Sequence, residues 1–519
     1  MEFKAKYITG FNDKGICLNE NDLNMLLFLY EHRLLTQRQL FEFYHISVKT
    51  YSDKSFYNRL TKFEKEGIIK RTRYDLIRRN GIFMYLVELE NKGIDILYLS
   101  GYLRKRYSQR IPTSNYEHFL GIKQSVLELY KVILKSDLYG FSIGVNTGKD
   151  GTGNVNDFIY VFDKKKANGV TGLYSVNRKE ELTIYKNGEF GVNSEQPRKR
   201  IENEYSHYKG SAPTSYGHIT NYFKDQGYPE DFVTGLYPDW MIAHKSNNIR
   251  NTYDIEFDTG SETYETLLKK IVNYMELNKK DERKHTVFIA SLDDSITLRG
   301  VTNVQTERLS VLKDKIMTGI VDKKNNKNDN NKKVTGDYDF RRDDLEIYVF
   351  PLGRSAKIFN KVMNKKRKKG ELSEQQKAIQ DFLIQNKNKL HLKLIKDKEQ
   401  QAKHNIYRTD FEVYEIQLLL ECTINEEEMV LLPFYLQEGN VRTMDIFCYF
   451  GDKIRHGNGF RAGYTKAIGI YQTKDEMLND ILSVEGIHNA NSLLFYCLDQ
   501  QRFYDVLTKE EIELTTPEL

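Results

Sequence analysis

The chain of 519 residues is long enough for about three domains, and a hydrophobic content of 39% is that of a folded protein. Lys and Arg number 78 against 73 Asp and Glu, an excess too small over this length to indicate nucleic-acid binding by itself. The N-terminus lacks an apolar signal core, and no apolar run approaches about 18 residues, so secretion and membrane spanning are not indicated and a cytoplasmic location is expected. The four cysteines form no Cys-x-x-Cys pair, which argues against a zinc ribbon or a disulfide framework.

Residues 21–67 carry the first clear pattern and predict three helices. Apolar residues at helical spacing form the inner face of the first helix: Leu23, Leu26, Leu27 and Tyr30. Thr36 and Gln39 form a capping box that starts a short second helix. A serine–aspartate pair can cap the third helix, and Gly67 ends it.

Two strands and a basic turn follow these helices. Residues 68–74 and 83–88 read as strands that flank Asn80-Gly81, a dipeptide typical of tight hairpins. Three helices and a hairpin indicate a winged helix, whose third helix enters the major groove of DNA while the wing meets phosphates. The side chains predicted to contact DNA are Lys54, Asn58, Arg59, Lys62, Arg71, Arg73, Arg78 and Arg79. Winged helices also mediate protein contacts, and outward lysines are usually only solvated, so a role without DNA stays open.

A helix with an apolar stripe is predicted from residue 116 to about 134 and begins the central domain. Glu117 and His118 near its start are available to a metal or a phosphate, although such residues are more often solvated surface groups. Residues 139–230, rich in Gly, Tyr, Asn and Lys, read as an insertion without an assigned role.

Acidic residues then gather around a predicted hairpin. Residues 233–243 and 251–257 read as strands joined by a polar turn. Asp239 lies on one strand and Glu256 on its neighbour, and Asp258 shares the face of Glu256 because the two are two residues apart. Acidic groups near strand ends are common, so a structural role is one alternative.

The helix after this hairpin supplies a lysine. Thr259 and Glu262 read as a capping box, and Glu262, Thr266, Lys270 and Tyr274 recur every four residues along one side of the helix. Carboxylates, water and a substrate phosphate are ligands that Mg²⁺ or Mn²⁺ accepts. The candidate catalytic residues are Asp239, Glu256, Asp258, Glu262 and Lys270, with Asp239 and Glu256 as metal ligands.

Strands and helices continue to alternate after the acidic block. Residues 285–291 and 345–351 read as strands and 306–318 as a helix, while 323–333 are too polar to pack. The basic run Lys365–Lys369 reads either as a solvated linker or as an arm that contacts phosphates.

A third module is predicted near the C-terminus. Residues 371–389 read as a helix, and 411–421, 428–437 and 444–449 read as strands. Residues 455–463 are glycine-rich and basic but lack the Gly-Lys-Ser/Thr ending of a phosphate-binding P-loop, so they indicate a flexible loop. The function of this module is not readable from its residues.

The expected fold class is α/β in a multidomain α+β arrangement. A winged helix occupies residues 1–110, and a mixed sheet flanked by helices occupies 111–360 with the insertion at 139–230. A basic linker and helix follow at 361–392, and the C-terminal α+β module spans 393–519.

Seven residues carry a family resemblance: Pro238, Asp239, Glu256, Asp258, Glu262, Lys270 and Tyr274. They match a pattern of a Pro-Asp strand, a Glu-x-Asp-x-Gly-x-Glu turn and a Lys-x-x-x-Tyr helix. The block resembles the PD-(D/E)xK, or restriction-endonuclease-like, superfamily, and more narrowly the replication-relaxation family of plasmid and integrative elements, related to MobC-type relaxases. The winged helix is similar to the N-terminal part of that family, and the resemblance covers about the first two thirds of the chain.

The resemblance implies a restriction-endonuclease-like sheet and DNA cleavage assisted by a metal ion. One departure is that Asp258 stands where the nuclease signature has a lysine. Lys270, or less favourably Lys269, would then supply the positive charge from the helix.

Two missing motifs narrow the function. No Walker A sequence appears, so an intrinsic ATPase or helicase is not expected. No two histidines among the 11 are separated by one residue, which removes the metal motif of common rolling-circle initiators and conjugative relaxases. A nicking reaction would therefore use carboxylates and a metal ion, with water as nucleophile or, as an alternative, a tyrosine such as Tyr274.

The preferred hypothesis is a relaxase-like, Mg²⁺- or Mn²⁺-dependent endonuclease that nicks a double-stranded origin-like site for mobilisation or replication. Its partners would include relaxosome accessory or coupling proteins. The alternative is a non-catalytic winged-helix protein for replication, transfer or regulation, with a degenerate nuclease fold. A third hypothesis is a restriction or defence nuclease without origin preference.

Overall fold

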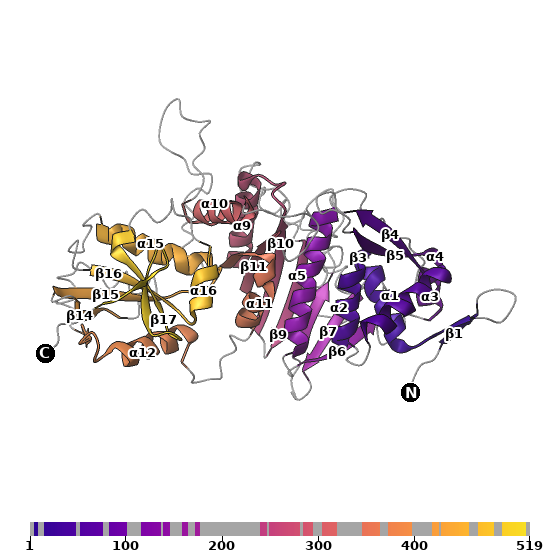
Figure 1. Ribbon diagram of the computed structural model, residues 1–519, viewed down its shortest axis with the longest axis horizontal. Coiled ribbons are helices and arrows are strands. Elements are labelled where there is room, and N and C mark those ends of the chain that lie inside the picture. Colours follow the sequence, from indigo (N-terminus) through magenta and orange to yellow (C-terminus); the bar gives the residue numbers. More distant parts are fainter. Residues whose placement is uncertain are drawn as a thin grey trace, which may run out of the picture. The chain divides into compact units, whose positions relative to one another are not determined.

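The computed structural model describes a large part of the chain, shown as the coloured elements of Figure 1. The described residues are 5–8, 15–47, 52–75, 83–100, 116–135, 139–145, 158–164, 172–176, 239–246, 249–280, 284–293, 304–318, 345–363, 372–396, 418–424, 427–455, 465–481 and 490–514. The predicted polar segment 323–333, the run Lys365–Lys369, most of the insertion at 139–230 and most of the glycine-rich loop at 455–463 lie outside them.

The chain forms two compact units. The first comprises residues 1–262, 276–302 and 352–360, and the second comprises 263–275, 303–351 and 361–519. Helices and mixed sheets occur in both, which confirms the α/β multidomain class.

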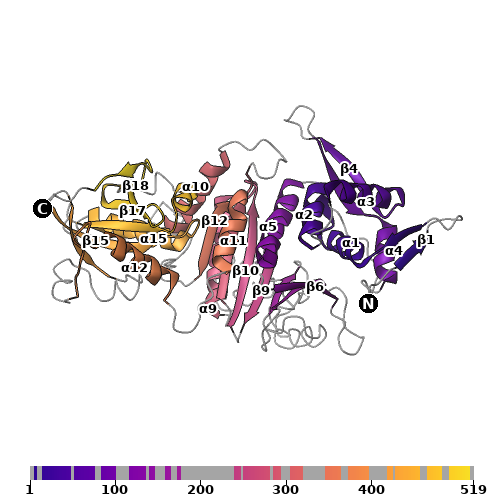
Figure 2. The ribbon, with the colours of Figure 1, turned by 60° about the horizontal axis from the view of Figure 1, so that its bottom comes forward.

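The first unit begins with a winged helix (Figure 2). Its helices are α1 (Glu20–His32), α2 (Gln37–Ser47), α3 (Asp53–Lys65) and α4 (Asn91–Leu99). Its strands are β3 (Leu34–Thr36), β4 (Ile69–Asp75) and β5 (Phe83–Leu89), in the sheet order β3-β5-β4. A separate antiparallel hairpin of β1 (Ala5–Ile8) and β2 (Gly15–Leu18) precedes α1.

Local hydrogen bonds set the helix ends of this domain. The Thr36 hydroxyl accepts from the Gln39 N–H and the Gln39 side chain accepts from the Thr36 N–H, each at 3.0 Å, so the predicted capping box starts α2. The Ser52 hydroxyl accepts from the Ser55 N–H at 3.3 Å and caps α3. Gly67, just past α3, has a φ of 67°, which only glycine adopts without strain. The predicted boundaries of the third helix are therefore confirmed.

A mixed sheet forms the other part of the first unit, in the order β11-β10-β9-β8-β7-β6. The strands are β6 (Tyr139–Val145), β7 (Phe158–Lys164), β8 (Gly172–Val176), β9 (Trp240–Ser246), β10 (Ile249–Asp258) and β11 (Lys284–Ser291). Strand β10 is antiparallel to β9 and parallel to β11. Ser246 pairs with Ile249, so β9 and β10 form the tight hairpin that the polar turn predicts.

Helix α5 (Tyr116–Lys135) packs between α2 and this sheet (Figures 1 and 2). The Gln39 side chain of α2 donates to the Leu120 carbonyl at 2.8 Å, and the Lys131 ammonium lies 2.7 Å from a carboxylate oxygen of Glu42. On the opposite side, a Cβ added to Gly121 would lie 2.1 Å from the Phe257 ring of β10. A side chain at position 121 would therefore push the helix away from the sheet.

A buried aromatic stack also joins the winged helix to the sheet. His32, the last residue of α1, lies with its ring 5.0 Å from the Trp240 ring of β9. The Lys123 ammonium of α5 lies 4.3 Å from the Trp240 ring centroid, a cation–π distance. Burial and the charge of Lys123 hold the pKa of His32 well below its usual range.

The second unit has a sheet in the order β13-β14-β15-β16-β17-β18-β19, in which β15, β16 and β17 are parallel. The strands are β13 (Lys393–Leu394), β14 (Leu420–Ile424), β15 (Glu427–Tyr435), β16 (Thr465–Tyr471), β17 (Leu493–Cys497), β18 (Arg502–Asp505) and β19 (Glu511–Ile512). Helix α12 (Glu374–Asn386) packs on one face of the sheet and α15 (Val441–Arg455) on the other.

Further elements complete the second unit. They are α10 (Val304–Thr318), β12 (Glu346–Pro351) and α16 (Lys474–Asn479). Helices α9 (Tyr264–Lys280) and α11 (Ser355–Met363) contribute residues to both units. The strands predicted at 285–291 and 345–351 and the helix predicted at 306–318 are confirmed.

The predicted strand at 444–449 is wrong, because these residues lie inside α15. The Asn440 side chain accepts from the Thr443 N–H at 3.1 Å and caps the helix. Met444, Phe447 and Phe450 all face the sheet core, at the spacing of three that a helix requires. A short apolar run fits either structure, and the cap that distinguishes them lies before the run.

Acidification is expected to destabilise the first unit through His32. Because folding lowers the pKa of His32, the unfolded chain binds the proton more readily, so the free energy of unfolding falls as the pH drops below about 6.5. The expected slope is up to about 1.4 kcal/mol per pH unit. Urea unfolding followed by fluorescence of Trp240, the single tryptophan, measures it at several pH values. His32→Phe should flatten the slope, and an unchanged slope in this variant would contradict the assignment.

Candidate functional site

The exposed side of α3 carries polar and basic side chains. Phe56, Leu60 and Phe63 face the core. We refer to four exposed residues on the same helix as the α3 ridge: Lys54, Asn58, Lys62 and Lys65. Within the part of the chain that the structure describes, no hydrogen bond or ion pair engages these four side chains. They are available to a ligand.

Arg59 has a different role from the α3 ridge. Its Nε donates to the Asp22 carboxylate at 3.1 Å, and a terminal nitrogen donates to the second oxygen of Asp22 and to the Cys17 carbonyl. The guanidinium carbon lies 4.9 Å from the Phe63 ring centroid. Arg59, predicted to lie near DNA bases, thus joins α3 to β2 and to the start of α1.

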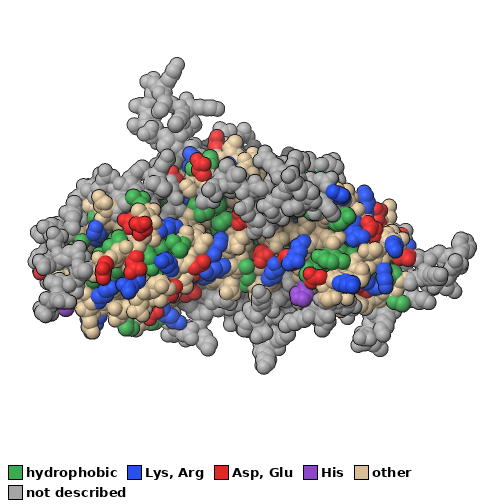
Figure 3. All heavy atoms as spheres, viewed as in Figure 1, with side chains coloured by type: hydrophobic (Ala, Val, Ile, Leu, Met, Phe, Trp, Pro, Cys, Tyr) green, Lys and Arg blue, Asp and Glu red, His purple; other side chains and the backbone are tan. Residues whose placement is uncertain are grey.

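Some basic side chains of the wing contact carboxylates within the same domain. Arg71 donates to Glu64 of α3 through Nε at 2.9 Å, and Lys70 lies 2.9 Å from Glu88 of β5. Arg73 is exposed on β4. The predicted contacts Arg78 and Arg79 lie outside the described residues. On the face shown in Figure 3, Lys and Arg side chains over the winged helix are interspersed with Asp and Glu.

The structure brings Asp239 next to the carboxylates of β10. Trp240 pairs with Ile255, so Asp239 lies beside the stretch that contains Glu256. One Asp239 carboxylate oxygen accepts from the Phe257 N–H at 2.8 Å and lies 3.4 Å from Nε2 of His118 on α5. Asp239 therefore directly precedes β9 and lies beside Glu256 of β10, and His118 approaches it from α5.

Three buried carboxylates follow each other along one face of β10: Asp254, Glu256 and Asp258. Asp254 contacts Nδ1 of His285 on β11 at 2.9 Å, and both side chains are fully buried. The Asn278 side chain accepts from the His285 N–H at 3.1 Å. The Asp254–His285 pair was not predicted from the sequence, although Asp254 continues the alternation of Glu256 and Asp258.

The helix after β10 begins later than predicted. The Asp258 carboxylate accepts from the Gly260 N–H at 2.9 Å and forms a turn in which Gly260 has a φ of 83°. The Thr263 hydroxyl then accepts from the Thr266 N–H at 3.2 Å and caps α9. The capping box predicted for Thr259 and Glu262 is wrong because the turn at Gly260 comes first.

The remaining predicted residues lie on either side of this cap. Glu262 precedes α9 and is half-buried, so it does not continue the helical row of Lys270 and Tyr274. Lys270 is half-buried on α9, and Tyr274 is buried. Both belong to the second unit, whereas Asp239, Glu256 and Asp258 belong to the first.

Whether the predicted metal ligands are available to a cation depends on the contacts that their carboxylate oxygens make. Among the residues that the structure describes, no group of three or more His, Cys, Asp or Glu side chains is placed to hold a metal ion. Asp239 already accepts from a backbone N–H, Asp258 holds a turn, and Asp254 pairs with His285. Each of these contacts engages one oxygen of its carboxylate.

A second polar cluster lies at the carboxyl ends of the parallel strands in the second unit. Lys313 of α10 and Asp480, both buried, lie 2.5 Å apart, and the Tyr471 hydroxyl donates to Asp480 at 2.9 Å. The Gly439 N–H donates to the same carboxylate at 3.1 Å. Burial and Asp480 raise the pKa of Tyr471 well above its usual range. Although ligands often bind at this edge of such sheets, these groups satisfy one another and fasten the turn after β15.

Residues 26–136 match the family model described as replication-relaxation. The matched segment runs from α1 through α5 and covers the winged helix and the helix that packs it onto the sheet. The predicted similarity to this family is thus confirmed for that segment. No curated protein and no solved structure matches the chain. No helix within the described ranges has the length and apolar character needed to cross a membrane.

Removing Asp254 should leave the buried His285 ring without its acceptor. Asp254→Ala is expected to lower the free energy of unfolding by about 1.5–3 kcal/mol, because the lost hydrogen bond is buried. Asp254→Asn keeps an acceptor oxygen and should lose less, and Asp381→Asn on the exposed side of α12 is the control. Chemical denaturation measures the differences, and a free energy of unfolding of Asp254→Ala equal to that of the wild type would show that the pair contributes nothing.

Proposed function

We propose that the protein binds duplex DNA through its winged helix and acts in the replication or mobilisation of a plasmid or integrative element. In this proposal it is a DNA-binding accessory or regulatory protein. The match of residues 26–136 to the replication-relaxation family supports the biological setting. The geometry of α3 supports the binding mode.

The α3 ridge is the observation that carries the proposal. Three lysines and one asparagine project from the third helix of a winged helix, where the fold presents its major-groove contacts. Ammonium groups attract phosphates, and an asparagine amide can both donate to and accept from an adenine edge. Arg59 and Arg71 hold the helix in its domain, so the ridge is presented rigidly.

The contacts within the central sheet support a scaffolding role for this domain. Its carboxylates contact a backbone N–H (Asp239), a histidine ring (Asp254) and a turn (Asp258), each of which stabilises the fold. These oxygens therefore already have partners within the protein when no substrate is bound. We therefore favour the non-catalytic reading of this domain.

Asn58→Ala tests whether Asn58 contacts a DNA base. If Asn58 contacts a base, affinity for the origin fragment should fall about 5- to 150-fold while affinity for unrelated duplex stays nearly unchanged, because a bidentate base contact contributes about 1–3 kcal/mol. Fluorescence anisotropy with both duplexes at fixed salt measures the two affinities. Lys377→Ala, on the exposed side of α12, is the matched control and should bind as the wild type does. Absence of duplex binding by the wild type would overturn the proposed function.

A second candidate is the relaxase-like nicking endonuclease, and one observation favours it. Asp239 directly precedes β9 beside Glu256 of β10, and His118 approaches the Asp239 carboxylate, so acidic and basic groups meet at one end of the β9–β10 hairpin. The cation would be Mg²⁺ or Mn²⁺ held by Asp239 and Glu256.

Supercoiled DNA that contains the origin separates the two candidates. We expect binding and no open-circular product with Mg²⁺, with Mn²⁺ or with EDTA. Nicking that requires the cation and is lost in Asp239→Asn and Glu256→Gln, but retained in Asp381→Asn, would establish the endonuclease instead. Gel electrophoresis of the plasmid forms gives the result directly.

A further inference from the structure

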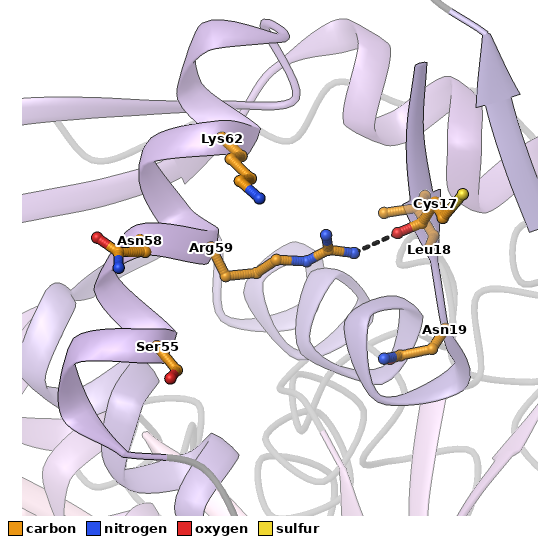
Figure 4. A pocket seen from close by; sticks show the side chains of 7 residues that line it. All are labelled: Cys17, Leu18, Asn19, Ser55, Asn58, Arg59 and Lys62. Atoms are coloured by element: carbon orange, nitrogen blue, oxygen red, sulfur yellow. Dashed lines mark hydrogen bonds between the residues drawn. The ribbon is translucent and has the colours of Figure 1, made fainter. Parts of the chain in front are cut away.

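A hollow of about 470 Å³ separates α3 from the strand β2. Residues from both sides line it: Cys17, Leu18, Asn19, Ser55, Asn58, Arg59 and Lys62. Figure 4 shows the Lys62 side chain directed into the gap and Arg59 reaching across it to the Cys17 carbonyl. The hollow thus extends the α3 ridge toward the N-terminal hairpin.

The charge of this hollow is suited to an anion. None of its lining residues carries a carboxylate. Asp22 on α1, which contacts Arg59, is 1% exposed and also accepts from the Asn19 N–H at 2.9 Å. The groups that face the space are therefore the ammonium of Lys62, the guanidinium edge of Arg59 and neutral hydroxyl and amide groups.

The position of the hollow complements that of the wing. Strand β4 packs against α3, where Arg71 contacts Thr61 and Glu64. Arg59 and Lys62 project from another side of the same helix, toward β2. A helix in the major groove has a phosphate backbone along each side. The β4–β5 hairpin lies on one side of α3 and the β1–β2 hairpin on another, so each hairpin lies toward one backbone when α3 occupies the groove.

From this placement we propose that the hollow receives a backbone phosphate of the bound DNA and that the β1–β2 hairpin is a second backbone-contacting arm. The phosphate accepts from Lys62 and from the outer N–H groups of Arg59. Arg59 has a further role as a positioning residue, since it holds β2 against α3. The inference rests on the proposed DNA binding and adds a surface to it.

Salt dependence of binding tests the contact at Lys62. Lys62→Gln should weaken binding by a similar factor on origin and unrelated duplex, and the slope of log K against log salt should become shallower by about 1. Lys377→Gln, at another exposed lysine on α12, should leave the slope unchanged. If the wild type binds DNA and Lys62→Gln has the same salt slope, the phosphate contact at Lys62 is rejected. The proposed function would then still stand.

A substitution on β2 tests the hairpin side of the hollow. Cys17→Glu places a negative charge there and should weaken binding about fivefold or more relative to Cys17→Gln, which has nearly the same size. Gln376→Glu on α12 controls for the added charge, and thermal unfolding of each variant reports the fold. Equal affinities of the Glu and Gln variants at position 17 would show that DNA does not approach β2. Failure of every variant and of the wild type to bind would instead reject the proposed function.

Discussion

The absence of a side chain at Gly121 is the constraint on which the first unit depends. Only a glycine lets α5 approach β10 closely enough for the Phe257 ring to occupy the space of a Cβ. On its other side α5 receives the Gln39 side chain and the Glu42 carboxylate of α2, so one helix holds the winged helix and the sheet together. The segment that matches the family model, residues 26–136, includes this helix.

Local signals made much of the winged helix predictable. The capping box of Thr36 and Gln39, the Ser52 cap and Gly67 act within a few residues of the chain, and each functions as its residue types predict. The hairpin of β9 and β10 was predictable for the same reason. The cap at Thr263 was missed because the Asp258 carboxylate formed a turn first, and α15 was missed because a short apolar run has the same composition in a strand and in a helix.

The candidate sites were less predictable, because their chemistry depends on partners far apart in the sequence. Arg59 reads as an outward basic residue of a helix, yet its guanidinium donates to Asp22, 37 residues earlier. His285 showed no pattern that would pair it with Asp254. A sequence reveals which groups can ionise, whereas the tertiary fold decides which of them already have a counterpart. Three residues of the ridge, Lys54, Asn58 and Lys62, were identified because exposure follows from helical spacing alone, whereas Lys65 was not among the predicted contacts.

The border strands of the second sheet have a consequence for association between copies of the chain. β13 and β19 each contain two residues, Lys393–Leu394 and Glu511–Ile512, and each places a charged side chain at the margin. A margin this short offers few unpaired amide and carbonyl groups to an incoming strand. The sheet is thereby protected against growth into fibrils even though its parallel centre is strongly apolar.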